Sequence, residues 1–197
     1  MAAPVMLRCD CHALESRLLL AGDLRAGVDL GLLSVVGDEA DNAVVVTQTF
    51  ERVRGEGGST ALRRSVVVIG LWKDGAATTV NGGRSASFPA DEVQDAVVDM
   101  AGGDDLALAA GLRLPGVLGM DGGDFGNDTI SVLRCRVDRL GIRMGNGNDP
   151  LAIFSTTVAG LASLTGEDGR DALVVLGSTF GSREIRNFEF VFPPTLR

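Results

Sequence analysis

The stretch GGDFGNDTISVLRCRVDRLGIRMGNGNDPLAIF, residues 122–154, decides the fold of this chain. It contains two glycine-rich acidic turns, and each turn ends in an aspartate that precedes a short run of alternating apolar residues. Similar turns lie on both sides of it, and the four final aspartates are Asp105, Asp128, Asp149 and Asp171. These aspartates are separated by 23, 21 and 22 residues. A repeat with a period in this range indicates a solenoid of stacked coils.

The strands between the turns supply two sets of apolar positions. The first set follows the turns and consists of Leu106 and Leu108, Ile130 and Val132, Leu151 and Ile153, and Leu173 and Val175. The second set recurs half a repeat later, at Leu118, Leu140 and Leu161. Residues two apart lie on one face of a strand, so we expect the two sets to line opposite walls of one narrow core. The sequence therefore predicts an all-β fold, a right-handed parallel β-helix (β-solenoid) with about 21–23 residues per coil.

The chain divides into a leader and a solenoid domain. Residues 1–26 differ in character from the rest and are predicted to be a disordered leader, whereas residues 27–197 form the solenoid domain. Within the domain, residues 51–64 break the pattern and are predicted to be an inserted loop, and residues 182–197 are predicted to cap the last coil. Asn42 and Asp105 are 63 residues apart, close to three periods, so we expect degenerate coils between them.

Composition excludes several classes of function. A net charge of −8 and a pI near 4.6, without clustered Lys and Arg, disfavour a nucleic-acid partner. No stretch approaches the ~20 apolar residues of a transmembrane segment, and no apolar region typical of a secretory signal is visible. The single histidine, His12, lies in the leader, which disfavours His-based catalysis in the repeats. Three cysteines in a chain of this length do not form a disulfide framework.

The acidic turns are candidate Ca²⁺ sites. Stacked coils lie ~4.8 Å apart, so equivalent turns bring their aspartates into a column of carboxylates whose repulsion a hard cation would remove. The predicted oxygen ligands are Asp105, Asp124, Asp128, Asn146, Asn148, Asp149, Asp168 and Asp171. The alternative is that Gly, Asn and Asp are simply the residues that tight turns require, with the carboxylates in water.

The same turns resemble the calcium-binding loops of haemolysin-type repeats. In that family Gly-Gly-x-Gly-x-Asp recurs every nine residues, whereas the interval here is 21–23 residues. The resemblance implies calcium bound at individual turns rather than in a continuous calcium roll.

A second resemblance lies in the leader. Leu14-Glu15-Ser16-Arg17-Leu18-Leu19-Leu20 is similar to the LEPR-XLL motif near the N-terminus of many planctomycete exported and surface proteins, with Ser16 where that motif usually has proline. Many of those proteins are built from β-solenoid repeats. The resemblance implies a sorting role for the leader and an exported or cell-surface location.

These observations predict a non-catalytic structural or adhesive module of an exported or cell-surface protein, with calcium as a candidate stabiliser of its acidic turns. Its expected partners are cell-surface or extracellular matrix components. The alternative is a carbohydrate-active β-helix enzyme, of the polysaccharide lyase or hydrolase type, or a degenerate relative of one. Arg134, Arg136, Arg139 and Arg143 lie near the acidic turns and favour that alternative, whereas one tryptophan and no tyrosine offer little aromatic platform for a sugar. A groove with convergent carboxylates, arginines and aromatics would distinguish the enzyme from the scaffold.

Overall fold

The computed structural model of the chain describes residues 20–54, 60–73 and 75–193. These residues form β-strands joined by turns and contain no helix, which confirms the predicted all-β solenoid. No helix able to cross a bilayer therefore occurs within the described ranges. The strands are β1 (Leu20–Asp29), β2 (Leu32–Val36), β3 (Ala43–Arg54), β4 (Thr60–Gly70), β5 (Trp72–Lys73), β6 (Ala76–Val80), β7 (Ser85–Pro89), β8 (Asp95–Asp99), β9 (Leu106–Ala110), β10 (Val117–Asp121), β11 (Thr129–Leu133), β12 (Arg136–Val137), β13 (Arg139–Arg143), β14 (Pro150–Phe154), β15 (Thr157–Thr165), β16 (Ala172–Leu176), β17 (Thr179–Arg186) and β18 (Phe190–Phe192).

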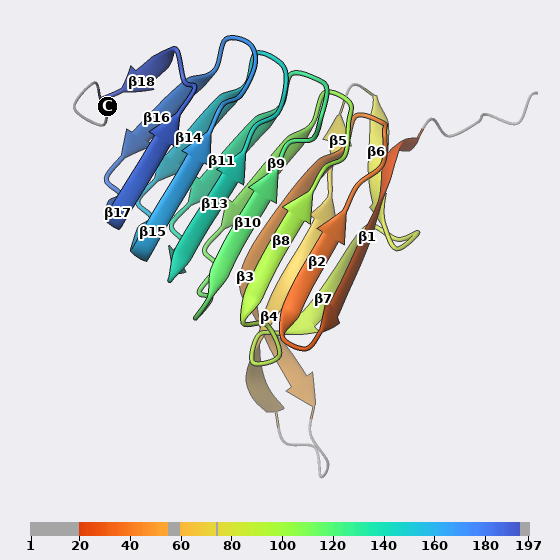
Figure 1. Ribbon diagram of the computed structural model, residues 1–197. Helices are drawn as coiled ribbons and strands as arrows, with labels where there is room; N and C mark the ends of the chain where they lie inside the picture. Colours follow the sequence, from red (N-terminus) through yellow and green to blue (C-terminus); the bar gives the residue numbers. More distant parts are fainter. Residues whose placement is uncertain (1–19, 55–59, 74, 194–197) are drawn as a thin grey trace, which may run out of the picture.

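Each regular coil contributes one strand to each of two facing walls (Figure 1). One wall contains β2, β8, β10, β13, β15 and β17, and the other contains β3, β9, β11, β14, β16 and β18. Neighbouring strands within these walls pair in parallel and in register, as in Leu118↔Leu140 and Ile130↔Leu151. The acidic turns join the first wall to the second, so they all lie at one corner of the stack.

The core lies between the two walls. Leu118 and Leu140 on one wall and Ile130 and Leu151 on the other are at most 1% exposed, as the alternation predicts. Leu140 pairs with Ala162, which is fully buried, whereas its neighbour Leu161 is 36% exposed. The prediction that Leu161 lines the core is therefore wrong by one residue, because β15 has an irregularity in its pairing between Val158 and Leu161.

A similar correction applies to the first strand of the regular repeat. In β9 the buried side chains are Ala107 and Ala109, and the predicted core residues Leu106 and Leu108 lie on the outer face. Ala107 pairs with Ile130, so it occupies the core position of the repeat despite its small size.

The N-terminal end of the stack contains antiparallel as well as parallel strand pairs. Asn42 and Asp105 lie in adjacent coils, because β3 pairs directly with β9. The expected degenerate coils between them are therefore absent from the described residues. The chain instead leaves the stack through the antiparallel hairpin β3–β4 and returns through β5, β6 and β7. β5 pairs antiparallel with β6, β7 pairs antiparallel with β4, and β6 also pairs in parallel with β1.

Two predicted segment boundaries differ from the structure. The predicted loop at residues 51–64 continues the hairpin β3–β4, whose outer ends project beyond the stack (Figure 1). β1 begins at Leu20, inside the predicted leader, and pairs with β2 and β6. Most of the LEPR-XLL-like motif, together with His12, lies outside the described residues.

The predicted C-terminal cap adds one more coil. β17 pairs in parallel with β15, and β18 pairs in parallel with β16. The exposed residues of β17 include Arg183, Glu184 and Arg186, so charged side chains occupy the last strand of this wall, as expected at a protected sheet edge.

Candidate functional site

The four aspartates that end the acidic turns lie in one column on successive coils. Each immediately precedes a strand of the second wall, and these strands, β9, β11, β14 and β16, pair in parallel. All four residues are at most 2% exposed. The predicted column of Asp105, Asp128, Asp149 and Asp171 is therefore confirmed, and we call it the aspartate ladder.

Hydrogen bonds from the backbone join successive rungs of the aspartate ladder. Oδ1 of each aspartate accepts the N–H of the equivalent residue in the preceding coil. The donor–acceptor distances are 2.5 Å from Asn42 N to Asp105, 2.8 Å from Asp105 N to Asp128, 2.7 Å from Asp128 N to Asp149 and 3.0 Å from Asp149 N to Asp171. Glu189 continues the series, because its Oε2 accepts the N–H of Asp171 at 2.6 Å. The side chains thus satisfy backbone donors at a corner that is buried from water.

The second oxygen of each ladder carboxyl, Oδ2, differs from Oδ1 in its hydrogen bonding. Oδ2 of all four aspartates is buried and has no hydrogen-bond partner among the described residues. Burial is the main cause that raises the pKa of Asp105 to about 8, of Asp128 to about 7 and of Asp149 to about 6. Burial also raises the pKa of Asp171. The backbone N–H bond opposes this shift at each rung, and a neighbouring acidic side chain adds to it.

The other four predicted ligands lie on the exposed outer rim of the turns. Asn148 donates from its backbone N–H and its Nδ2 to Asn127 Oδ1, both at 3.1 Å. Asn127 N–H in turn donates to Asp104 Oδ1 at 2.7 Å, and this bond is the largest cause that lowers the pKa of Asp104. Asp168 contributes its backbone carbonyl, which accepts the N–H of Gly147 at 2.8 Å.

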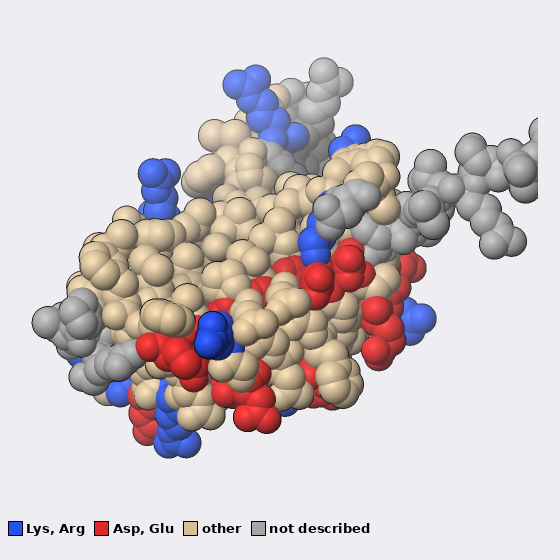
Figure 2. All heavy atoms as spheres, turned by 90° about the horizontal axis from the view of Figure 1, so that it is seen from above, with Lys and Arg blue, Asp and Glu red and all other residues tan. Residues whose placement is uncertain are grey.

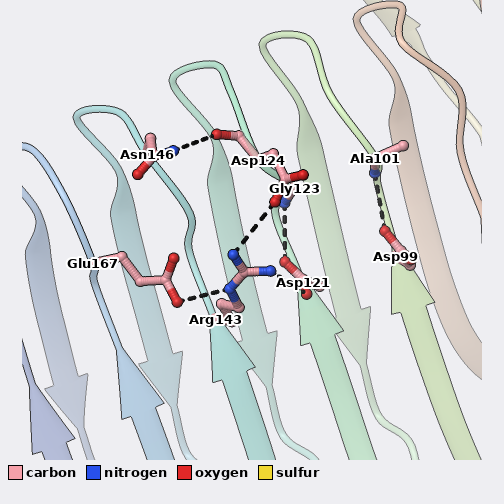
Figure 3. A network of polar contacts seen from close by, with 8 residues as sticks. All are labelled: Asp99, Ala101, Asp121, Gly123, Asp124, Arg143, Asn146 and Glu167. Atoms are coloured by element: carbon pink, nitrogen blue, oxygen red, sulfur yellow. Dashed lines mark hydrogen bonds and ion pairs between the residues drawn. The ribbon is translucent and has the colours of Figure 1, made fainter.

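Arg143 organises the remaining rim residues, as Figure 3 shows. Its Nε lies 2.7 Å from Glu167 Oε1, and its Nη1 and Nη2 lie 3.4 Å from Asp121 Oδ2 and Asp124 Oδ1. The bond to Glu167 is the largest cause that raises the pKa of Arg143. Asn146 Nδ2 donates to the backbone carbonyl of Asp124 at 2.8 Å. Three carboxylates, those of Asp121, Asp124 and Glu167, thus surround Arg143. Acidic side chains form a band along the molecule in Figure 2.

The predicted calcium ligands are therefore divided between two environments. The aspartate ladder is buried and bonded to the backbone. The other four predicted ligands form part of the exposed rim of the turns, namely Asp124, Asn146, Asn148 and Asp168. In the described part of the chain, no group of three or more His, Cys, Asp or Glu side chains is arranged so that it could hold a metal ion. These residues do not converge on a single ion site, and calcium binding stays a prediction that concerns the exposed turn residues, because the ladder carboxyls are buried and bonded to the backbone.

The glycines of the turns allow the coils to approach closely. Gly103, Gly126, Gly147 and Gly169 lie in one column, and a Cβ on any of the last three would overlap the carbonyl oxygen of the glycine in the preceding coil. Gly126 and Gly169 also have φ values of +131° and +138°, which favour glycine. The glycines are therefore required by the stacking of the coils as well as by the sharp turns.

A second, neutral ladder lies at another corner of the stack. Cys135 N–H donates to Thr156 Oγ1 at 3.2 Å, and Thr156 N–H donates to Ser178 Oγ at 3.0 Å. Burial raises the pKa of the Cys135 thiol. This corner uses the same device as the aspartate ladder, a side-chain oxygen that accepts the backbone N–H of the preceding coil.

A groove on the outer face of the first wall is the nearest feature to an enzyme cleft. It has a volume of about 370 Å³, its floor contains Gly119, Gly141 and Ser163, and Asp121, Arg143 and Glu167 lie at one end. None of its lining residues is aromatic. The groove therefore has the carboxylates and the arginine of the enzyme alternative without a stacking platform for a sugar ring.

Sequence reasoning missed the two ends of the aspartate ladder. Asn42 ends an acidic turn just as the four aspartates do, so the repeat itself identifies it once Asn is allowed at the last position. Glu189 follows Asp171 by 18 residues, which is shorter than the repeat, and no sequence signal indicates it. The pairing of Arg143 with Glu167 also has no signal in the local sequence, because the two residues are in different coils.

Comparison of the chain with protein-family models, curated proteins and solved structures finds no match.

Proposed function

We propose that this chain is a non-catalytic structural or adhesive module of an exported or cell-surface protein. The observation that carries the proposal is the use of the turn side chains. Oδ1 of every ladder aspartate accepts a backbone N–H of the preceding coil, and Asn127 and Asn148 form a similar series on the rim. The most distinctive polar residues of the repeat thus hold coils together.

This bonding suits a rigid spacer. In a solenoid each coil is stabilised only by its neighbours, so bonds between coils determine the stiffness of the whole array. The outer faces of the two walls then remain available for contact with surface or matrix components. Export is supported by the resemblance of residues 14–20 to the LEPR-XLL motif.

The location is tested on the full chain in the cells that produce it. Protease added to intact cells is expected to degrade the protein, and a variant that lacks residues 2–19 is expected to stay inside the cells and be protected. Protection of the full chain until the cells are lysed would contradict a surface location. Secreted protein in the medium would support export without attachment.

Calcium belongs to the proposal as a stabiliser of the exposed rim. Glu39, Asp99, Asp121 and Asp124 line one cavity of about 300 Å³ together with Arg143, although in the described structure they are not arranged as a ready-made ion site. Because the ladder carboxyls already accept backbone hydrogen bonds, the rim carboxylates are the ones accessible to an ion. Thermal unfolding of the full chain in calcium and in chelator tests this, since a ligand of the folded state raises the unfolding midpoint. Asp124→Asn is expected to reduce the shift, and equal midpoints in millimolar calcium and in chelator would exclude stabilisation by calcium.

The enzyme alternative rests on the groove that ends at Arg143. Incubation of the full chain with a panel of acidic and neutral polysaccharides, followed by an assay for new reducing ends, distinguishes it from the scaffold. We expect no release above that of Arg143→Gln. Release that depends on Arg143 would contradict the non-catalytic proposal.

A further inference from the structure

The proposed scaffold role explains why each rung of the aspartate ladder carries a hydrogen-bond acceptor, but not why that residue is a titratable aspartate. A turn needs a hydrogen-bond acceptor at Oδ1, and an asparagine would supply one without the risk of a buried charge. The chain nevertheless places four aspartates in succession, each at most 2% exposed and each with a buried Oδ2 that lacks a partner. An ionised carboxylate that is buried with an unpaired oxygen is costly, and stacked carboxylates repel.

Asn42 shows which kind of group, a hydrogen-bond donor, stands in its turn at the position that corresponds to Oδ2. This residue occupies the rung before Asp105 and is fully buried. Its Oδ1 lies against Gly22 of β1, on the side of the stack away from Asp105, so it faces in the same direction as Oδ1 of the aspartates. Its Nδ2 donates to carbonyl oxygens of its own turn, at 2.7 Å from Ala40 O and 3.1 Å from Asp38 O.

In two rungs Oδ2 takes the place that Nδ2 has in Asn42. Oδ2 of Asp128 and of Asp171 lies close to the first glycine of its own turn, Gly122 and Gly166, just as Nδ2 of Asn42 lies close to Gly37. A carboxylate has no hydrogen to donate into the turn, whereas a carboxylic acid has one on this oxygen. The geometry of the turn therefore favours the protonated side chain.

The charged groups around the aspartate ladder reinforce this preference. Most of the charged groups whose electrostatic effect on the ladder is resolved are acidic and raise the pKa of its carboxyls. In the described structure Lys73 is the one cation among them, and it lowers the pKa of Asp105 and Asp128. The acidic groups are Asp41 and Asp128 at Asp105, Asp104 and Asp149 at Asp128, Asp104 and Asp171 at Asp149, and Glu167 and Glu189 at Asp171. Arg143 is directed to the rim carboxylates instead.

We propose that the aspartate ladder is a proton-binding site whose carboxyl groups take up protons when the chain folds near neutral pH. The solenoid is consequently more stable in mildly acidic than in alkaline solution. The inference does not depend on the proposed function, because it concerns only the bonding between coils.

The direction of the pH dependence follows from linkage. The pKa of each ladder carboxyl is raised in the folded chain above the ordinary value of 3.8, to about 8 for Asp105 and about 7 for Asp128. At pH values between 3.8 and the raised pKa values, the folded chain binds more protons than the unfolded chain, so the stability of the fold falls as the pH rises. The contribution of the ladder is fully present below pH 3.8 and is lost as the pH rises through the folded pKa values.

The test is urea unfolding of the full chain at constant ionic strength from about pH 5 to about pH 8. The unfolding equilibrium constant of the unaltered chain is expected to rise by at least about tenfold over this range, since one excess proton gives tenfold per pH unit. Asp105→Asn and Asp128→Asn keep Oδ1 and add a donor, so each is expected to reduce the rise, and the double variant more than either. Asp91→Asn is the matched control, because Asp91 is an exposed aspartate that is not among the acidic groups acting on the ladder.

An equilibrium constant that stays constant or falls as the pH rises would overturn the proposal. So would ladder variants that keep the full rise of the unaltered chain. If the variants do not fold, ¹³C NMR of the aspartate carboxyl carbons in the unaltered chain decides. The ladder carboxyls are expected to remain protonated at a pH where Asp104 is ionised, and ionisation of all five over the same range would overturn the proposal.

Discussion

Single glycines and aspartates determine how closely the coils of this protein stack. The glycine column removes a Cβ wherever a carbonyl oxygen of the preceding coil lies, and the aspartate ladder bonds the N–H groups that the turn leaves without a sheet partner. The two residue types therefore act on the same contact between coils, one by steric fit and one by hydrogen bonding. Their regular recurrence in the sequence has this structural cause.

Gly147 allows a test of the steric contribution alone, because its φ lies outside the left-handed region that disfavours alanine. Gly147→Ala is expected to lower the free energy of unfolding by about 1–3 kcal/mol, the usual cost of overpacking. Gly141→Ala is the control, since a Cβ there meets nothing within 4 Å, and it should change stability by less than about 0.5 kcal/mol. Chemical denaturation of both variants measures the difference, and equal effects would contradict the steric role of the column.

At the scale of elements, the sequence predicts the regular coils better than the N-terminal end. The period identifies the turns and the alternation identifies most buried positions, because each regular coil repeats the same two strands. Ala107 is missed because a small residue occupies a core position between two leucines that point outward. The hairpin β3–β4 is missed because residues 51–64 carry charged residues and glycines that break the apolar alternation, and only pairing across the chain shows that they extend two antiparallel strands.

The outer part of hairpin β3–β4 is expected to be dispensable for stability. Phe50 and Leu62 are 68% and 69% exposed, so little apolar surface is buried there. Replacement of residues 52–62 by Asn-Gly joins the paired residues Glu51 and Arg63 through a two-residue turn. Thermal unfolding should show a change of less than about 0.5 kcal/mol, whereas Val46→Ala, in the buried part of the same strand, should cost about 2 kcal/mol. A loss in the shortened variant as large as that of Val46→Ala would show that the projection supports the stack.

At the scale of the whole molecule, one continuous core runs through the stack from β1 to β18. Each coil contributes a thin layer of side chains to it, so every layer supports the coils on both sides. A cavity in a middle layer therefore weakens the array as a whole, while truncation on an outer face does not.

Two leucines of the repeat allow a comparison between a cavity in the core and a truncation on the outer face. Leu140 is 1% exposed in the middle of the stack, whereas Leu161 is 36% exposed although the period places it at the equivalent position. Leu140→Ala is expected to lower the free energy of unfolding by about 2–5 kcal/mol, and Leu161→Ala by less than about 1 kcal/mol. Denaturant titration followed by circular dichroism measures both values, and a larger loss at Leu161 would contradict the register of β15.

Hydrogen exchange of the turn amides tests most directly the claim that buried carboxyls bond successive coils. The amides of Asn42, Asp105, Asp128 and Asp149 donate to ladder carboxyls, and all four residues are buried. They are expected to exchange as slowly as amides in the central strands, because exchange would require the coils to separate. The amide of the exposed Asn146, in the turn that ends at Asp149, serves as the reference. Exchange of the four ladder amides as fast as that of Asn146 would contradict the account.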